Sequence, residues 1–64
     1  METKTIIASD IKATTIKGAI KEIENSKKYR HMASVYAYKN EIGHADAVEA
    51  IATHIIINDS DFEI

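Results

Sequence analysis

Apolar residues recur at helical spacing in the last third of the chain, in the stretch HADAVEAIATHIII. Val48, Ile51 and Ile55 fall on one face of a helix, while Asp46 faces away and suits the positive end of the helix dipole. The pattern predicts a helix over residues 45–56. Three consecutive isoleucines close the stretch and favour extended structure, so we expect the helix to give way there to an extended tail.

An earlier stretch has the same period. Its apolar residues at helical spacing are Ala13, Ile16, Ala19, Ile20 and Ile23. Ser9 or Asp10 can cap the start, because either side-chain oxygen can accept from free N–H groups of the first turn. Continuing the stripe past Ser26 reaches Lys27, so the sequence predicts that this first helix ends near Ser26. Gly18 lies inside it and indicates a close approach of a second helix.

The stretch KKYRHMASVYAYKNE, which follows, separates its residue types better as a helix than as a strand. In a helix, one stripe is polar and consists of Lys27, Arg30, His31, Ser34, Tyr38 and Glu41. The other stripe consists of Tyr29, Met32, Ala33, Tyr36 and Ala37. We therefore predict a helix over residues 27–41, capped by Ser26 and stopped by Gly43. The alternative is a strand over residues 30–39, in which neither face is cleanly apolar.

Both ends of the chain favour extended structure. The β-prone run Thr3–Ala8 is too short to be stable without a partner, and the tail NDSDFEI can supply one. The fold class expected is mainly α: one small three-helix domain over residues 1–64, whose extended terminal segments pair. The alternative, with residues 30–39 as a strand, would make it α+β. The predicted core residues are Ile16, Ile20, Ile23, Met32, Tyr36, Val48, Ile51 and Ile55.

Composition limits how such a fold can be stabilised. A chain of 64 residues buries only about 60% of the surface that it exposes when unfolded, so it is marginal alone. It has no cysteine, which excludes disulfides and thiolate metal sites, and twelve isoleucines with no leucine supply most of the core.

No apolar run approaches the roughly 20 residues of a membrane span, and METKTIIASD does not resemble a signal peptide. We expect a cytoplasmic protein without a membrane partner.

Charge is unevenly distributed along the chain. Residues 1–31 carry seven positive and four negative charges, whereas residues 32–64 carry one positive and six negative, although the net charge is only −2. Such asymmetry favours head-to-tail association of two copies and steers encounters with charged partners. A homodimer is therefore one expectation.

The sequence contains no recognisable catalytic or metal-binding pattern. Folding could bring His44, Asp46 and His54 together, but their spacing matches no zinc pattern. We therefore expect His31, His44 and His54 at the surface or at helix ends. His54 can cap carbonyls at the end of its helix. No G-x-S-x-G context surrounds a serine, and two glycines cannot form a phosphate-binding loop. We predict a protein that is not an enzyme and binds no cofactor.

A chain of this kind is expected to act by binding. The candidate partner-binding residues are Lys27, Lys28, Tyr29, Arg30, Tyr38, Asp59, Asp61 and Phe62. Tyrosine and arginine are favoured at interface hot spots, and an acidic tail can engage a basic site on a partner. The leading hypothesis is a small protein-interaction module that acts as a regulator, adaptor or inhibitor of a larger protein. The alternative is a nucleic-acid-binding protein that uses its basic first half, which fits less well because the chain is acidic overall.

Overall fold

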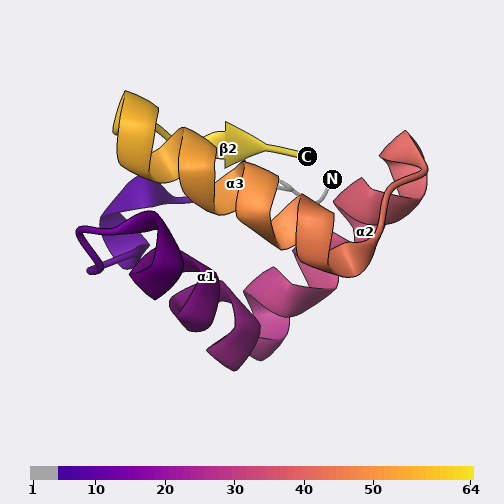
Figure 1. Ribbon diagram of the computed structural model, residues 1–64, viewed down its shortest axis with the longest axis horizontal. Helices are drawn as coiled ribbons and strands as arrows, with labels where there is room; N and C mark the ends of the chain where they lie inside the picture. The colour runs from indigo at the N-terminus through magenta and orange to yellow at the C-terminus, as the bar shows by residue number, and fades with distance from the viewer. Residues whose placement is uncertain (1–4) are drawn as a thin grey trace.

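The computed structural model of the protein describes residues 5–64, and Figure 1 shows its elements. In chain order they are β1 (Thr5–Ile6), a 3-10 turn (Ala8–Asp10), α1 (Ile16–Asn25), α2 (Lys27–Asn40), α3 (His44–Asn58) and β2 (Phe62–Glu63). The prediction of a mainly α, three-helix domain whose terminal segments pair is confirmed. The alternative with a strand over residues 30–39 is wrong, because α2 covers those residues.

The start of the first helix differs from the prediction. Helix α1 begins at Ile16 and is capped by Thr15, whose hydroxyl accepts from the Gly18 N–H at 3.1 Å. Ser9 and Asp10 lie instead in the separate 3-10 turn. The chain between the two is held by Glu22, whose carboxylate accepts two backbone N–H bonds, from Lys12 at 3.1 Å and from Ala13 at 2.6 Å. These contacts fix a loop where the period alone indicated helix.

Gly18 allows a close approach of the chain that precedes α1, and not of another helix as the sequence indicated. A Cβ added at this position would lie 2.9 Å from the Cβ of Ala13 and 3.1 Å from Oγ1 of Thr15. The loop that precedes α1 therefore folds back onto its first turn, and only a residue without a side chain leaves room for it.

Helix α2 follows its predicted stripes closely. Ser26 caps it by accepting from the Tyr29 N–H at 3.3 Å. The prediction that Gly43 stops the helix was wrong. Glu41 adopts the left-handed conformation at φ 55°, and the Ile42 N–H closes the turn on the Ala37 carbonyl at 3.0 Å. Gly43 has φ −71° and precedes α3 as its N-cap.

Helix α3 extends two residues beyond the predicted end, to Asn58. Asp59 then adopts φ 48° and donates its N–H to the Ile55 carbonyl at 3.0 Å. The isoleucine run that favoured extended structure is helical because Ile55 is buried in the core and Ile56 packs against it. Tertiary packing has overridden the local propensity here.

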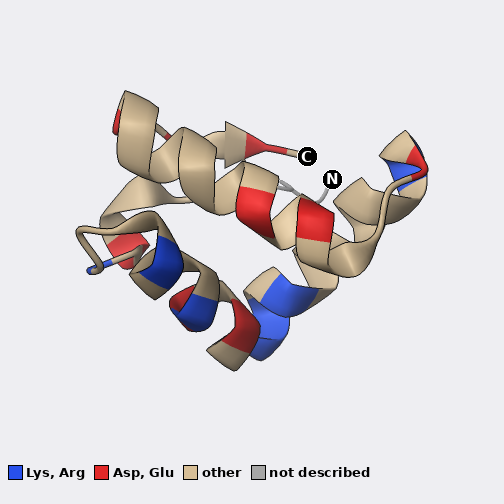
Figure 2. Ribbon diagram, in the orientation of Figure 1, with Lys and Arg blue, Asp and Glu red and all other residues tan. Residues whose placement is uncertain are grey.

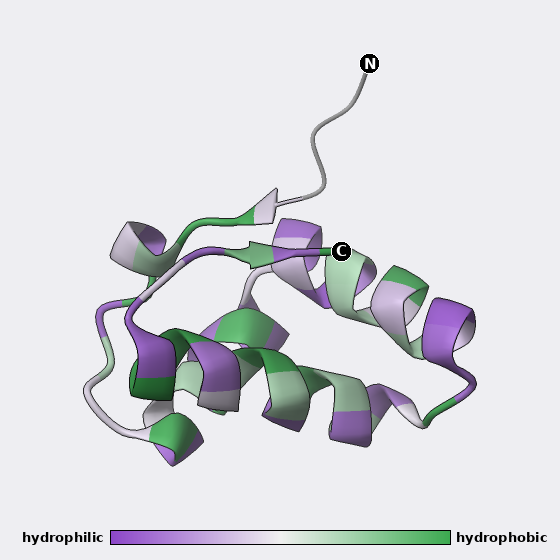
Figure 3. Ribbon diagram, turned by 90° about the horizontal axis from the view of Figure 1, so that it is seen from above, coloured by the Kyte–Doolittle hydropathy of each residue, from purple (hydrophilic) through white to green (hydrophobic). Residues whose placement is uncertain are grey.

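The two short strands close the molecule over the helices. They are antiparallel, with Ile6 opposite Phe62, and Figure 3 shows them side by side. The Asp61 carboxylate supports them by accepting from the Ala8 N–H at 2.8 Å. The predicted pairing is confirmed for these residues, while residues 3 and 4 of the predicted run lie outside the described part of the chain.

The core lies where the three helices and β1 meet. It consists of Ile6, Ile11, Ala19, Ile23, Tyr29, Met32, Ala33, Val48, Ile51, Ala52 and Ile55. Of the predicted core residues, Ile16, Ile20 and Tyr36 are only partly buried and pack against this cluster. The core residues that sequence periodicity missed include Ile6 and Ile11, which lie outside the helices.

Candidate interaction surface

The exposed side of α2 carries a continuous stripe, which we call the outer face. It consists of Lys27, Arg30, His31, Ser34 and Tyr38, all exposed. The Tyr38 side chain is 87% exposed, the most of any large hydrophobic residue among residues 5–64. Because Tyr38 comes nine residues after Tyr29, about two and a half helical turns, the two rings leave opposite sides of α2.

Three cations occupy the first turn of α2 or lie next to it. Lys27, Lys28 and Arg30 are exposed there, and this first turn contains no acidic residue. The N-terminus of a helix carries partial positive charge, so cations at this end oppose the helix dipole. Figure 2 shows both basic and acidic segments on α1, basic segments at the start of α2, and acidic segments on α3. The fold places these charges at a position where they do not favour helix formation.

Tyr29 lies in the core rather than on the surface. Its side chain is only 7% exposed, and its hydroxyl donates to Oδ2 of Asp10 at 2.6 Å. Burial raises the pKa of Tyr29 above its ordinary value, and the hydrogen bond to Asp10 raises the pKa further. A partner can therefore reach this candidate residue only where its ring lines a pocket.

The candidate residues of the tail have roles in the fold. Asp59 ends α3, and Asp61 binds the backbone of Ala8. Phe62 is partly buried, with its ring edge-to-face against Tyr36 and His54 at centroid distances of 5.1 Å. These contacts fix the tail against α2 and α3, so a partner would meet it as an ordered segment.

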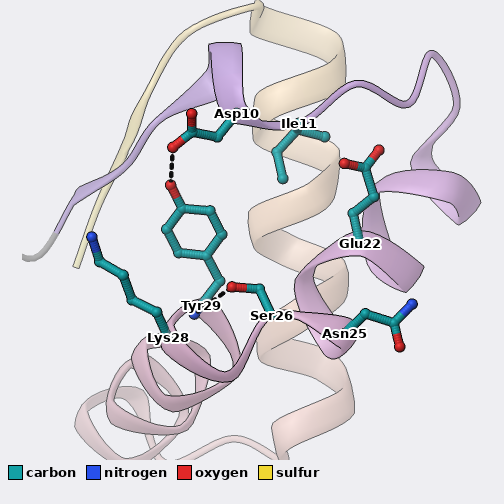
Figure 4. A pocket seen from close by; sticks show the side chains of 7 residues that line it. All are labelled: Asp10, Ile11, Glu22, Asn25, Ser26, Lys28 and Tyr29. Atoms are coloured by element: carbon teal, nitrogen blue, oxygen red, sulfur yellow. Dashed lines mark hydrogen bonds between the residues drawn. The ribbon is translucent and has the colours of Figure 1, made fainter.

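A pocket opens at the corner where α1 meets α2. It has a volume of about 550 Å³ and is lined by Asp10, Ile11, Glu22, Asn25, Ser26, Lys28 and Tyr29. We call it the corner pocket. Figure 4 shows the Asp10 and Glu22 carboxylates on either side of Ile11, with Tyr29 and Ser26 below them. The pocket thus combines two apolar side chains with two acids and one lysine.

Sequence reasoning identified only Lys28 and Tyr29 among the lining residues. Asp10 and Glu22 come from a turn and a helix far apart in sequence, and no local pattern relates them. The lysine ammonium lies 5.9 Å from the centre of the Tyr29 ring. Within the described part of the chain, the one ion-pair contact is between His44 and Glu24, so neither pocket carboxylate has a charged partner there.

A hydrogen-bonded chain links the three helices at another corner. His44 at the start of α3 donates from Nε2 to Oε1 of Glu24 at 3.0 Å, and its Nδ1 lies 3.0 Å from the Ser34 hydroxyl. The Ser34 hydroxyl also lies 3.2 Å from the Arg30 carbonyl, so its single proton has two acceptors. Both His44 and Glu24 are partly exposed. These hydrogen bonds connect α1, α2 and α3.

The other histidines do not assemble a metal site. Among residues 5–64, no group of three or more histidine, aspartate or glutamate side chains is placed to hold a metal ion. His54 donates from Nε2 to the Asp61 carbonyl at 3.2 Å, so it holds the tail instead of capping the last turn of α3. None of the helices in this part of the chain combines the length and apolar character needed to cross a membrane.

The chain matches no protein-family model, no curated protein and no solved structure.

Proposed function

We propose that the protein is a small interaction module that regulates a larger protein by binding it as an adaptor or inhibitor. The observation that carries the proposal is the 87% exposed Tyr38 on the outer face of α2, directly opposite the buried side of the helix. Tyrosine supplies a large contact area at little cost in conformational entropy, and it is enriched at interface hot spots.

The charges of the same face support this proposal and indicate the partner's chemistry. Lys27 and Arg30 oppose the α2 dipole, at a cost to helix stability of about 0.3–1 kcal/mol each at an exposed position. Among residues 5–64, neither side chain forms an ion pair that would offset this cost, and exceptions to local rules are expected at functional sites. The partner surface that fits is an apolar slot for Tyr38 with acidic side chains facing Lys27 and Arg30.

The test compares capture of a binding protein from native host extract by three tagged forms of the chain. Tyr38→Ser removes the proposed anchor, and Ile57→Ser is the matched control because Ile57 is 67% exposed at the far end of α3. A captured protein should bind the wild type and Ile57→Ser, and should be lost with Tyr38→Ser. The purified partner should then bind Lys27→Gln/Arg30→Gln more weakly than the wild type. This loss of affinity should be larger at low salt than at high salt. Equal capture by all three forms would refute the outer face as the interface.

A second copy of the chain is one possible partner, since the two halves carry opposite charge. Sedimentation across a wide concentration range distinguishes it, because a homodimer has twice the 7.1 kDa mass of the chain. If Tyr38 mediates the dimer, Tyr38→Ser should sediment as a monomer at concentrations where Ile57→Ser remains dimeric.

Nucleic-acid binding is the second candidate, favoured by the exposed cations Lys17 and Lys21 on α1 together with those at the start of α2. Phosphate binding by these groups would fall steeply with salt, because each neutralised phosphate releases a counterion. The interaction proposal expects no retention of the wild type on mixed DNA or RNA at about 150 mM salt. Retention that Lys27→Gln/Lys28→Gln/Arg30→Gln abolishes would establish the second candidate instead.

A further inference from the structure

We propose that the corner pocket binds a guanidinium group carried on an aliphatic stem, as in the side chain of arginine. This site is separate from the outer face of α2, and the inference goes beyond the proposed function. The lining brings together two carboxylates, Asp10 and Glu22, and two apolar surfaces, Ile11 and the Tyr29 ring. That combination matches a ligand with a cationic head and an apolar stem.

Both carboxylates are already held in place by the fold. Oε1 and Oε2 of Glu22 each accept one backbone N–H, and Oδ2 of Asp10 accepts the Tyr29 hydroxyl. A carboxylate has about four acceptor positions, so each group keeps acceptor capacity after making these bonds. Preorganised acceptors need not lose side-chain entropy when a ligand binds, which favours charge-assisted hydrogen bonds from a cation.

The shape of the pocket favours guanidinium over a compact ammonium or a metal ion. In Figure 4 the two carboxylates flank Ile11, so a head group must reach to either side of an apolar residue. A guanidinium presents five N–H donors in a planar fork, whereas an ammonium is a compact point charge. Two carboxylates are too few for a closed calcium or magnesium site, and they would repel a phosphate.

Lys28 provides a test of whether the ligand is positively charged. Its ammonium lies over the Tyr29 ring, and in Figure 4 its side chain runs along the side of that ring away from Glu22. The lysine is therefore a nearby positive charge that leaves the space between the carboxylates open. Removing this charge should strengthen binding of a cation, while removing either carboxylate charge should weaken it.

The experiment uses the full chain and two blocked amino acids, Nα-acetyl-arginine amide and its neutral isostere Nα-acetyl-citrulline amide. Binding is followed by the backbone amide NMR signals of Ile11, Asn25 and Tyr29. The arginine compound should shift these signals saturably, with a dissociation constant in the millimolar range, and the citrulline compound should not. The absence of a saturable shift, or equal shifts with both compounds, would overturn the proposal.

Variants then assign the effect to the pocket. Asp10→Asn keeps an acceptor for the Tyr29 hydroxyl and should weaken binding about three- to tenfold. Glu49→Gln removes the same charge from the exposed surface of α3 and should change affinity little. Lys28→Gln should bind more tightly than the wild type. If Asp10→Asn and Glu49→Gln weaken binding equally, the ligand only senses net charge and no site exists.

Two further comparisons identify the source of the group and keep this inference separate from the proposed function. The tripeptide Ala-Arg-Ala with blocked ends represents a partner's side chain, and butylguanidine, which carries the same single charge, represents a free guanidine; the tighter of the two identifies the source. Tyr38→Ser should bind the arginine compound as the wild type does, because Tyr38 does not line the pocket. Loss of binding in Tyr38→Ser would show that the signal comes from the outer face and would overturn the assignment.

Discussion

The inner and outer sides of α2 each carry a tyrosine, but the two tyrosines lie in opposite environments. On the inner side, Tyr29 is 7% exposed and its hydroxyl is bonded to Asp10. On the outer side, Tyr38 is 87% exposed and belongs to a stripe with Lys27 and Arg30. The inner side is explained by the fold, because its side chains fill the core. The outer side is not, since its cations oppose the helix dipole, and this difference is why we assign binding to it.

The largest expected effect is on the free energy of unfolding, when the same isoleucine-to-alanine change is made at a buried and at an exposed position of α3. Ile51 is 0% exposed and Ile57 is 67% exposed. Ile51→Ala should lower the free energy of unfolding by about 2–5 kcal/mol, because it removes buried methyl groups and leaves a cavity. Ile57→Ala should change it by less than about 0.5 kcal/mol. Urea unfolding of both variants provides the measurement, and equal losses would contradict the assignment of the two sides.

A smaller effect is expected when one oxygen atom is removed from each tyrosine. Tyr29→Phe deletes the hydrogen bond to Asp10 without opening the core, so it should cost about 1–2 kcal/mol of unfolding free energy. Tyr38→Phe should cost almost nothing, since the structure gives its hydroxyl no hydrogen bond within residues 5–64. Thermal unfolding of the two variants beside the wild type tests this. A larger loss for Tyr38→Phe would mean that the outer side serves the fold.

The helical period was sufficient to assign the two sides of α2 from the sequence. Every residue of its predicted polar stripe is exposed, and four residues of its apolar stripe are buried, with Tyr36 half-buried. The period could not locate the start of α1. Ser9, Asp10 and Thr15 are all acceptable caps locally, and the choice is decided by bonds from Glu22 to the backbone of residues 12 and 13.

The corner pocket could not be predicted for the same physical reason. Asp10 meets Tyr29 across nineteen positions of sequence, and this pairing exists only after α1 and α2 have packed. Likewise Glu24 on α1 contacts His44 on α3, which lies twenty positions away in the sequence. Contacts within one helix follow from spacing, whereas contacts between helices depend on packing angles that a single sequence does not reveal.

Alkaline pH should weaken the inner side selectively. Burial and the bond to Asp10 raise the pKa of Tyr29 above its ordinary value of 10.0. The unfolded chain therefore releases this proton at lower pH than the folded chain, so stability is fully retained below about pH 10 and falls as the pH rises through the raised pKa. The unfolding free energy of the wild type should fall more steeply above about pH 10 than that of Tyr29→Phe. Parallel pH profiles for the two proteins would contradict the proposed cause.

The smallest expected effect concerns the cations of the outer side and the residue next to them. In Lys27→Gln/Lys28→Gln/Arg30→Gln, removal of charges that oppose the dipole should stabilise α2 slightly. Loss of the Lys28 ammonium from the face of the Tyr29 ring should cost about 0.5–1 kcal/mol in the opposite direction. We therefore expect the triple variant to have an unfolding free energy close to that of the wild type. Lys27→Gln/Arg30→Gln, which keeps Lys28, should be slightly more stable than the wild type.

Thermal unfolding at low salt, where dipole effects are largest, measures both variants. A clear loss of stability in Lys27→Gln/Arg30→Gln would mean that these charges serve the fold, and it would remove the argument that α2 retains them for a partner.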